Sequence, residues 1–173
     1  MKTLQATVSL ASTLLLVVLA SASANTAPIS PTDAFQLLKT LAGEWTGTVT
    51  EPDSGPPVTV IYRVTAGGSA VEELLFPGTA HEMVTMYHLD AGQVVLTHYC
   101  AMGNQPRMAL GPDSTAGKLV FHFVTAGNLA SPDAVHMHSG TITFKEPDRI
   151  EASWDVFEKG AKVGENKFFL TRK

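Results

Sequence analysis

Two segments that have the composition of β-strands carry histidine or cysteine side chains at alternate positions. His136 and His138 are separated by one residue, and His98 and Cys100 have the same spacing. Because side chains along a β-strand point alternately to its two faces, each pair is expected to share a face. Imidazole groups held in a dry pocket can ligate a transition metal or form hydrogen bonds with a ligand.

The neighbours of His136 and His138 indicate which face they occupy. Ile142 and Phe144 stand at the even positions of the same segment and mark that side as the core face. Strict alternation therefore predicts that both histidines point inward. A β-bulge at Gly140 would reverse this orientation.

The strand that contains His98 leads to the same prediction. Val94 and Leu96 make its even side apolar, so His98 and Cys100 are expected to face the core. A Cys–His pair can also act as nucleophile and base, but nothing obvious in the sequence completes a catalytic triad. A single cysteine is most often a small buried hydrophobic residue.

The residue that faces His98 from the preceding strand depends on the length of one turn. Residues 90–92 read Asp-Ala-Gly, which suits a three-residue hairpin loop that ends in a left-handed glycine. This turn pairs Leu89 with Gln93 and places Glu82 inside, beside His98. A turn of two or four residues would put His81 there in place of Glu82.

These orientations predict one interior cluster with three possible roles. As a metal site it would hold zinc, iron, manganese or copper, so a divalent transition metal is a possible cofactor. It could instead form a polar pocket that binds a small molecule, or a buried hydrogen-bonded network that binds nothing. The candidate metal ligands are Glu82, His98, His136 and His138.

A second group of polar residues follows the His98 strand. In the string GNQPRM, the hydrogen-bonding residues Asn104, Gln105 and Arg107 stand beside a glycine and a proline, and the forked guanidinium of Arg107 could clamp a carboxylate or phosphate. Tyr99, which precedes this string, could cap a ligand pocket with its polar hydroxyl. Alternatively, these side chains satisfy the backbone of their own loop. The candidate ligand-binding residues are Glu82, His98, Tyr99, Asn104, Arg107, His136 and His138.

The elements that must position these residues are short strands joined by turns. A helix is expected over residues 34–41, capped by Thr32 or Asp33, after which the apolar period changes to two. Short links leave no room for βαβ crossovers, so we expect an all-β antiparallel barrel of about 8–10 strands. The expected strands are 43–51, 58–65, 69–76, 81–89, 93–101, 106–110, 118–125, 135–144, 149–158 and 166–172.

The first residues have the features of an export signal. Lys2 precedes an apolar run, and Ala22-Ser23-Ala24 fits the small-x-small rule of signal peptidase, so cleavage is expected after Ala24. Polar residues interrupt the apolar run, which disfavours a transmembrane anchor. The expected organisation is a signal peptide over 1–24, a flexible lead over 25–31 and one β domain over 32–173. The mature protein is expected to be periplasmic or secreted and not to bind membranes.

Composition excludes several function classes. The formal net charge of −4 becomes −5 once Lys2 is removed, so the domain lacks the basic surface that nucleic acid binding requires. Cys100 is the only cysteine, which rules out an internal disulfide. The sequence has no Gly-rich phosphate loop and no HExxH or GxSxG motif. Composition does not fix the oligomeric state.

Four stretches resemble a family of exported bacterial proteins of unknown function, grouped with calycin-like and lipocalin-like barrels. They are LAGEWTG at 41–47, the pair HEMVTMYHLD and LTHYCAMGNQPRM at 81–90 and 96–108, and NLASPDAVHMH at 128–138. The resemblance covers nearly the whole mature chain. It implies a barrel and an exported location but carries over no catalytic residue.

The sequence therefore predicts an exported β-barrel that binds a small molecule in a partly polar interior pocket. One alternative is a metal-dependent enzyme or metal-binding protein that uses the same interior His/Glu cluster. Another is a structural or interaction module.

Overall fold

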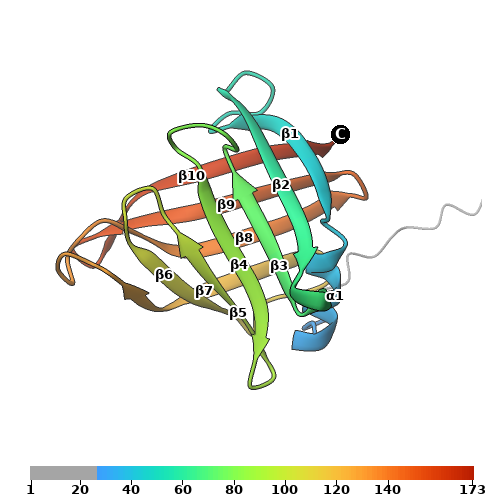
Figure 1. The fold of residues 1–173 in the computed structure, drawn as a ribbon, viewed down its shortest axis with the longest axis horizontal. Helices are drawn as coiled ribbons and strands as arrows, with labels where there is room; N and C mark the ends of the chain where they lie inside the picture. Colours follow the sequence, from blue (N-terminus) through green and yellow to red (C-terminus); the bar gives the residue numbers. More distant parts are fainter. Residues whose placement is uncertain (1–26) are drawn as a thin grey trace, which may run out of the picture.

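Ten strands and one α-helix make up residues 27–173, the part of the chain that this computed structural model describes (Figure 1). The expected signal peptide lies outside the described residues. The helix is α1 (Pro31–Lys39), and the strands are β1 (Gly43–Val49), β2 (Pro57–Thr65), β3 (Ala70–Leu75), β4 (Met83–Asp90), β5 (Gln93–Tyr99), β6 (Gln105–Leu110), β7 (Lys118–Gly127), β8 (His136–Glu146), β9 (Arg149–Glu158) and β10 (Ala161–Arg172).

Each strand pairs antiparallel with the next one along the chain, and β1 pairs with β10 to close the barrel. Closure leaves no strand edge exposed, which removes the main route by which sheets associate. The all-β, calycin-like barrel expected from the sequence is confirmed, and each of the ten predicted segments contains a strand.

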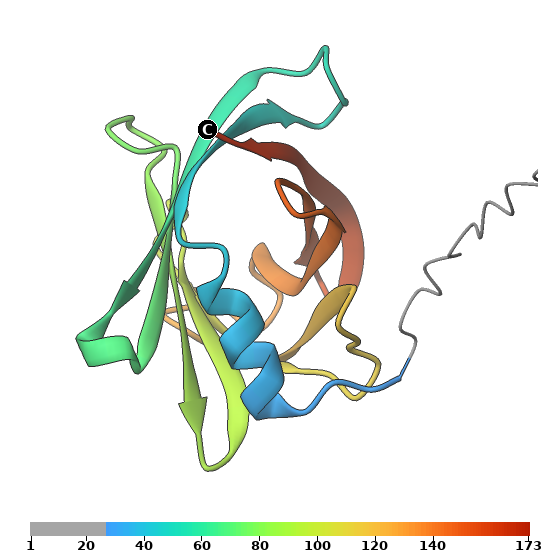
Figure 2. The same cartoon turned by 90° about the vertical axis from the view of Figure 1, so that its right-hand side faces the viewer.

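Helix α1 covers one end of the barrel (Figure 2). Phe35 and Leu38 are buried, and the helix packs on β4 and β5. The helix begins at Pro31, three residues earlier than predicted, because Ser30 is the N-cap: its Oγ accepts a hydrogen bond from the backbone N–H of Asp33 at 3.1 Å. Part of the expected flexible lead over 25–31 is hydrogen-bonded to the β6–β7 connection, because the N–H of Ile29 donates to the carbonyl of Ser114 at 3.0 Å.

Arg172, the last residue of β10, connects the end of helix α1 to the barrel. The guanidinium of Arg172 lies 4.3 Å above the ring of Trp45 and donates hydrogen bonds of 2.8 Å to the carbonyls of Thr40 and Ala42. These carbonyls follow the last turn of α1 and have no partner within the helix. Trp45 Nε1 in turn donates to the carbonyl of Leu41 at 2.8 Å.

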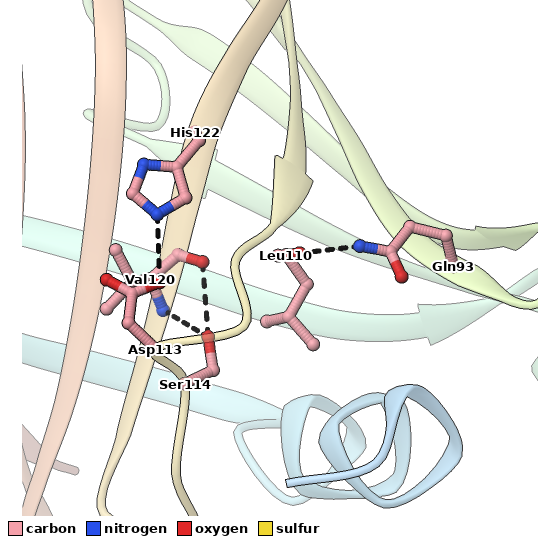
Figure 3. Close-up of polar contacts among 6 residues, drawn as sticks. All are labelled: Gln93, Leu110, Asp113, Ser114, Val120 and His122. Atoms are coloured by element: carbon pink, nitrogen blue, oxygen red, sulfur yellow. Dashed lines mark hydrogen bonds and ion pairs between the residues drawn. The ribbon is translucent and has the colours of Figure 1, made fainter. Parts of the chain in front are cut away.

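Side-chain contacts hold the β6–β7 connection (Figure 3). The hydroxyl of Ser114 accepts from the N–H of Val120 at 2.9 Å and donates to the carbonyl of the same residue at 3.2 Å. His122 Nε2 lies 2.8 Å from Asp113 Oδ1 at the surface, and this contact lowers the pKa of Asp113. His122 therefore takes part in a surface contact that supports the turn.

Candidate functional site

A cavity of about 430 Å³ is lined by the β3–β4 and β5–β6 connections, which lie at the end of the barrel away from helix α1 (Figure 1). Its walls also include the interior faces of β4, β5, β8, β9 and β10. Most of the lining side chains are apolar or contain sulfur. The polar ones are Thr79, His81, His98 and Asn166.

A two-residue turn between β4 and β5 decides which side chains enter this cavity. Asp90 pairs with Gln93, and the two loop residues, Ala91 and Gly92, have φ values of 48° and 80°. The prediction of a three-residue turn is therefore wrong, and the register that would have brought Glu82 inward does not form. His81 lines the cavity with His98, as the alternative register predicted.

Glu82 lies outside the cavity and is exposed. Its carboxylate accepts a hydrogen bond of 2.6 Å from the backbone N–H of Gly78. This contact closes the β3–β4 connection.

A β-bulge in β8 separates two further candidates from His98. The pairing of β8 with β9 shifts between Met137 and Ser139, one to three residues before Gly140. On the C-terminal side of the bulge, Gly140 and Ile142 face the interior. On its N-terminal side, Met137 is the residue that lines the cavity. The prediction that His136 and His138 point into the barrel is therefore wrong, because both line a separate groove with Phe123 and Phe157.

The two histidines are held in that groove by one another and by aromatic rings. His136 Nδ1 lies 2.8 Å from the carbonyl of Ala134, and its Nε2 lies 3.1 Å from His138 Nδ1. The ring of His138 stacks between Phe123 and Phe157, at centroid distances of 4.5 Å and 3.9 Å. Burial and the neighbouring His136 lower the pKa of His138.

Around His98 the structure assembles a polar network that the sequence interpretation missed. Glu73 is 1% exposed, and its carboxylate accepts hydrogen bonds from Tyr62 at 2.6 Å and Tyr87 at 2.9 Å. Thr85 also donates to Glu73, and its Oγ1 lies 2.9 Å from His98 Nδ1. Alternation along 69–76 carries the signal for Glu73, because this residue lies between Val71 and Leu75 on the apolar side of its strand.

This network defines the tautomer of His98. The hydroxyl of Thr85 has one proton, which it gives to Glu73, so its oxygen accepts from His98 Nδ1–H. The Nε2 atom of the neutral ring is then an acceptor. Burial lowers the pKa of His98 to about 4, which keeps the ring neutral near pH 7. Burial raises the pKa of Glu73, against the hydrogen bonds that lower it.

Two buried nitrogen atoms on the cavity wall have no hydrogen-bond partner among residues 27–173. They are His98 Nε2 and Trp154 Nε1, and both residues line the cavity. The two rings are stacked, with centroids 5.4 Å apart and an interplanar angle of 29°. One unused acceptor and one unused donor therefore lie buried in the wall of the cavity, within two residues that line it.

The remaining candidates make structural contacts away from the cavity. Asn104 Nδ2 donates to the carbonyl of Val135 at 2.9 Å, and Tyr99 is half exposed. The guanidinium of Arg107 forms a 2.5 Å ion pair with Asp90 on the outside of the barrel. Gln105 Nε2 donates to the carbonyl of Gly103 at 3.0 Å. Only the contact of Gln105 lies within the loop itself, as the alternative expected, whereas Asn104 and Arg107 contact Val135 and Asp90 on other segments.

The four candidate metal ligands do not come together. Glu82 is at the surface, His98 is in the cavity, and His136 and His138 are in the other groove. Within the described part of the chain, no three or more His, Cys, Asp or Glu side chains are grouped as a metal site would require.

The fold and the cavity define a closed ten-stranded barrel of the calycin-like class. No family model matches the sequence, and neither does any curated protein. Among solved structures, the chain is similar to a protein of unknown function from the DUF3598 family of Nostoc punctiforme, with a TM-score of 0.49 and 15% sequence identity. The match covers 79% of this chain and 49% of that one, so the chain spans about half the length of that protein.

Proposed function

We propose that the barrel binds one small, largely apolar molecule in the cavity next to His98. The observation that carries this proposal is the Nε2 atom of His98, which is buried without a partner in a residue that is 2% exposed. A buried acceptor left unpaired costs about 1–3 kcal/mol, which a ligand that donates a hydrogen bond would recover. Trp154 Nε1 offers a donor to the same ligand.

The properties of the cavity limit the class of ligand. Among residues 27–173, no Asp, Glu, Lys or Arg side chain lines it, and His98 is neutral near pH 7 because of its low pKa. A charged ligand would lose its hydration there without gaining a counter-charge. The volume of about 430 Å³ is in the range of small-molecule sites. We therefore propose a neutral molecule with one polar group that donates a hydrogen bond, such as an alcohol, a phenol or an amine in its neutral form.

The test uses N-phenyl-1-naphthylamine, a neutral apolar fluorophore with one N–H donor. We expect saturable binding of one molecule per barrel and a rise in fluorescence as the probe leaves water. His98→Phe removes the acceptor and keeps a ring beside Trp154, so it should weaken binding by about 10-fold, the value of one hydrogen bond.

His88→Phe is the matched control, since His88 lies on β4 and does not line the cavity. Its affinity for the probe should equal that of the wild type. If the probe fails to bind the wild type, or if His98→Phe and His88→Phe bind it equally well, the proposed role of His98 is wrong.

We also propose that the protein is exported and acts in the periplasm or outside the cell as a soluble binder. The support is the apolar run followed by Ala22-Ser23-Ala24. Within residues 27–173, no helix combines the length and apolar character needed to cross a membrane. N-terminal sequencing of protein from the producing cell should begin at Asn25, within one or two residues. Material from the membrane fraction that still begins at Met1 would contradict export.

A further inference from the structure

Sulfur atoms are concentrated on the wall of the cavity. Of the five methionines in residues 27–173, three line it, and the only cysteine of the chain lines it with them. Cys100 Sγ lies 4.0 Å from Met83 Sδ. The four sulfur-bearing residues are Met83, Cys100, Met102 and Met137.

A second observation points to a ligand at the same place. His98 is two residues before Cys100 and lines the same cavity, and its Nε2 is buried without a partner. A residue with a thiol, a residue with a thioether and a residue with an unpartnered imidazole nitrogen therefore line one cavity.

We propose that Cys100, Met83 and His98 bind a monovalent copper ion in the cavity, with Met102 and Met137 available as further thioether ligands.

The spacing of the two sulfur atoms fits a shared metal ion. Metal–sulfur bonds to thiolates are about 2.3 Å long. An ion placed at that distance from both Cys100 Sγ and Met83 Sδ, which are 4.0 Å apart, would have an S–metal–S angle of about 120°. This angle suits three-coordinate copper(I), for which His98 Nε2 would supply the third bond.

Charge and ligand softness favour copper(I) over the common divalent ions. Thiolate and thioether ligands select soft metals, and Zn²⁺ has a lower preference for a neutral thioether. The described part of the chain contributes no Asp, Glu, Lys or Arg side chain to the cavity lining, so one Cu⁺ with the Cys100 thiolate gives a neutral centre. A divalent ion in the same place would leave a buried positive charge without a counter-ion.

The surroundings of His98 also suit a metal ligand. A metal-bound histidine normally donates its other N–H to a protein oxygen, which fixes the ring and raises its basicity. His98 Nδ1–H donates to Thr85 Oγ1, and Thr85 in turn donates to the buried Glu73. The ring is thus oriented with Nε2 free before any ion arrives.

Binding involves proton release and no change of oxidation state. The S–H bond of Cys100 breaks, its proton goes to solvent, and a copper–sulfur bond forms. The bound ion is Cu⁺ before and after the step. Each bound ion should therefore release one proton.

The experiment titrates the folded protein, without oxygen and with ascorbate present, against the copper(I)–bicinchoninate complex, whose colour is lost when the protein removes the ion. We expect one Cu⁺ per chain. Native mass spectrometry should show the mass of one copper atom less one proton. Because substitutions outside the ligand shell already cost about 10–100-fold in metal affinity, Cys100→Ser should weaken binding by at least about 100-fold and Met83→Leu by at least about 10-fold.

Met86→Leu is the matched control, because Met86 is on the same strand as Met83 and does not line the cavity. It should bind copper(I) as the wild type does. Far-ultraviolet circular dichroism checks the fold of each variant, and Cys100→Ala replaces Cys100→Ser if the serine variant does not fold. The proposal would be overturned if the wild type took up no copper(I). It would also be overturned if the Cys100 and Met83 variants bound copper(I) as tightly as the wild type.

The copper site and the apolar-ligand site can fail separately. Binding of N-phenyl-1-naphthylamine without copper(I) uptake would reject only the copper site. Copper(I) uptake without probe binding would reject only the proposed small-molecule function.

Discussion

Thr85 and His98 lie opposite each other in the β4–β5 ladder, and Thr85 Oγ1 is 2.9 Å from His98 Nδ1. This hydroxyl links two groups, since it donates to Glu73 and accepts from the imidazole. Thr85 is fully buried, so no solvent can replace either hydrogen bond. The orientation of the unpartnered Nε2 atom therefore depends on one threonine.

Thr85→Val should remove both hydrogen bonds while keeping the shape of the side chain. The Nδ1–H of His98 is left unpaired and Glu73 loses a donor, so the free energy of unfolding should fall by about 1–3 kcal/mol. Urea unfolding measures this loss. Thr97→Val is the control, because Thr97 on β5 is part-buried and has its neighbour Met86 across the ladder. If both variants lose equal stability, the hydrogen bonds of Thr85 are not what stabilises the barrel.

His98 should make the barrel less stable in acid. Its pKa is about 4 in the folded protein and about 6.5 in an unfolded chain, so below about pH 6.5 the unfolded state takes up a proton that the folded state refuses. Stability is lost between about pH 6.5 and pH 4, by about 3 kcal/mol at most. His98→Gln should remove this dependence.

The measurement compares urea unfolding of the wild type and His98→Gln across this pH range. The raised pKa of Glu73 has the opposite effect to the lowered pKa of His98, because it adds stability as the pH falls through the folded pKa of Glu73. Since Glu73 is present in both proteins, the difference between their stabilities isolates the effect of His98. Parallel curves for the two proteins would mean that His98 does not titrate as a buried neutral group.

Alternation and turn chemistry were sufficient to predict the barrel but not the cluster within it. The ten strands follow from composition and short links, which act over whole segments. The side of the sheet on which Glu82 lies depended on whether the β4–β5 turn has two residues or three. Ala91 adopts a positive φ of 48° in a two-residue loop, where glycine or asparagine is usual, so the sequence favoured the longer turn.

The two histidines of β8 illustrate the same limit. Ile142 correctly marks the core face, but the pairing shift between Met137 and Ser139 exchanges the faces beyond it. A bulge of one residue leaves little trace in composition, because it depends on how two strands pair. Glu73, by contrast, was predictable, since its strand alternates regularly.

Gly140→Ala should disturb the wall of the cavity. A Cβ atom at this position would lie 2.8 Å from Cζ3 of Trp154, the ring that stacks on His98. Overpacking of this kind costs about 1–3 kcal/mol, and displacement of Trp154 should weaken binding of the fluorescent probe. Gly164→Ala is the control, because its Cβ would be 3.9 Å from Val156. Equal melting temperatures for the two variants would contradict the close contact at Gly140.

The hydroxyl of Tyr62 should stabilise the barrel most when Glu73 is ionised. It donates to the buried carboxylate at 2.6 Å, and hydrogen bonds to charged groups contribute about 1.5–3 kcal/mol. Tyr62→Phe should therefore lower the free energy of unfolding by about that amount at pH values above the folded pKa of Glu73. Without this donor the pKa of Glu73, which burial already raises, should rise further.

The pH dependence separates this effect from a loss of packing. A carboxyl group with a raised folded pKa contributes stability at low pH that is lost as the pH rises through that pKa, and Tyr62→Phe increases the loss. The difference between wild type and Tyr62→Phe should thus shrink as the pH falls and Glu73 is protonated in both proteins. Tyr99→Phe, which removes a half-exposed hydroxyl, should differ little from the wild type at any pH. A difference for Tyr62→Phe that stays constant with pH would show that Tyr62 contributes through packing and not through the charge of Glu73.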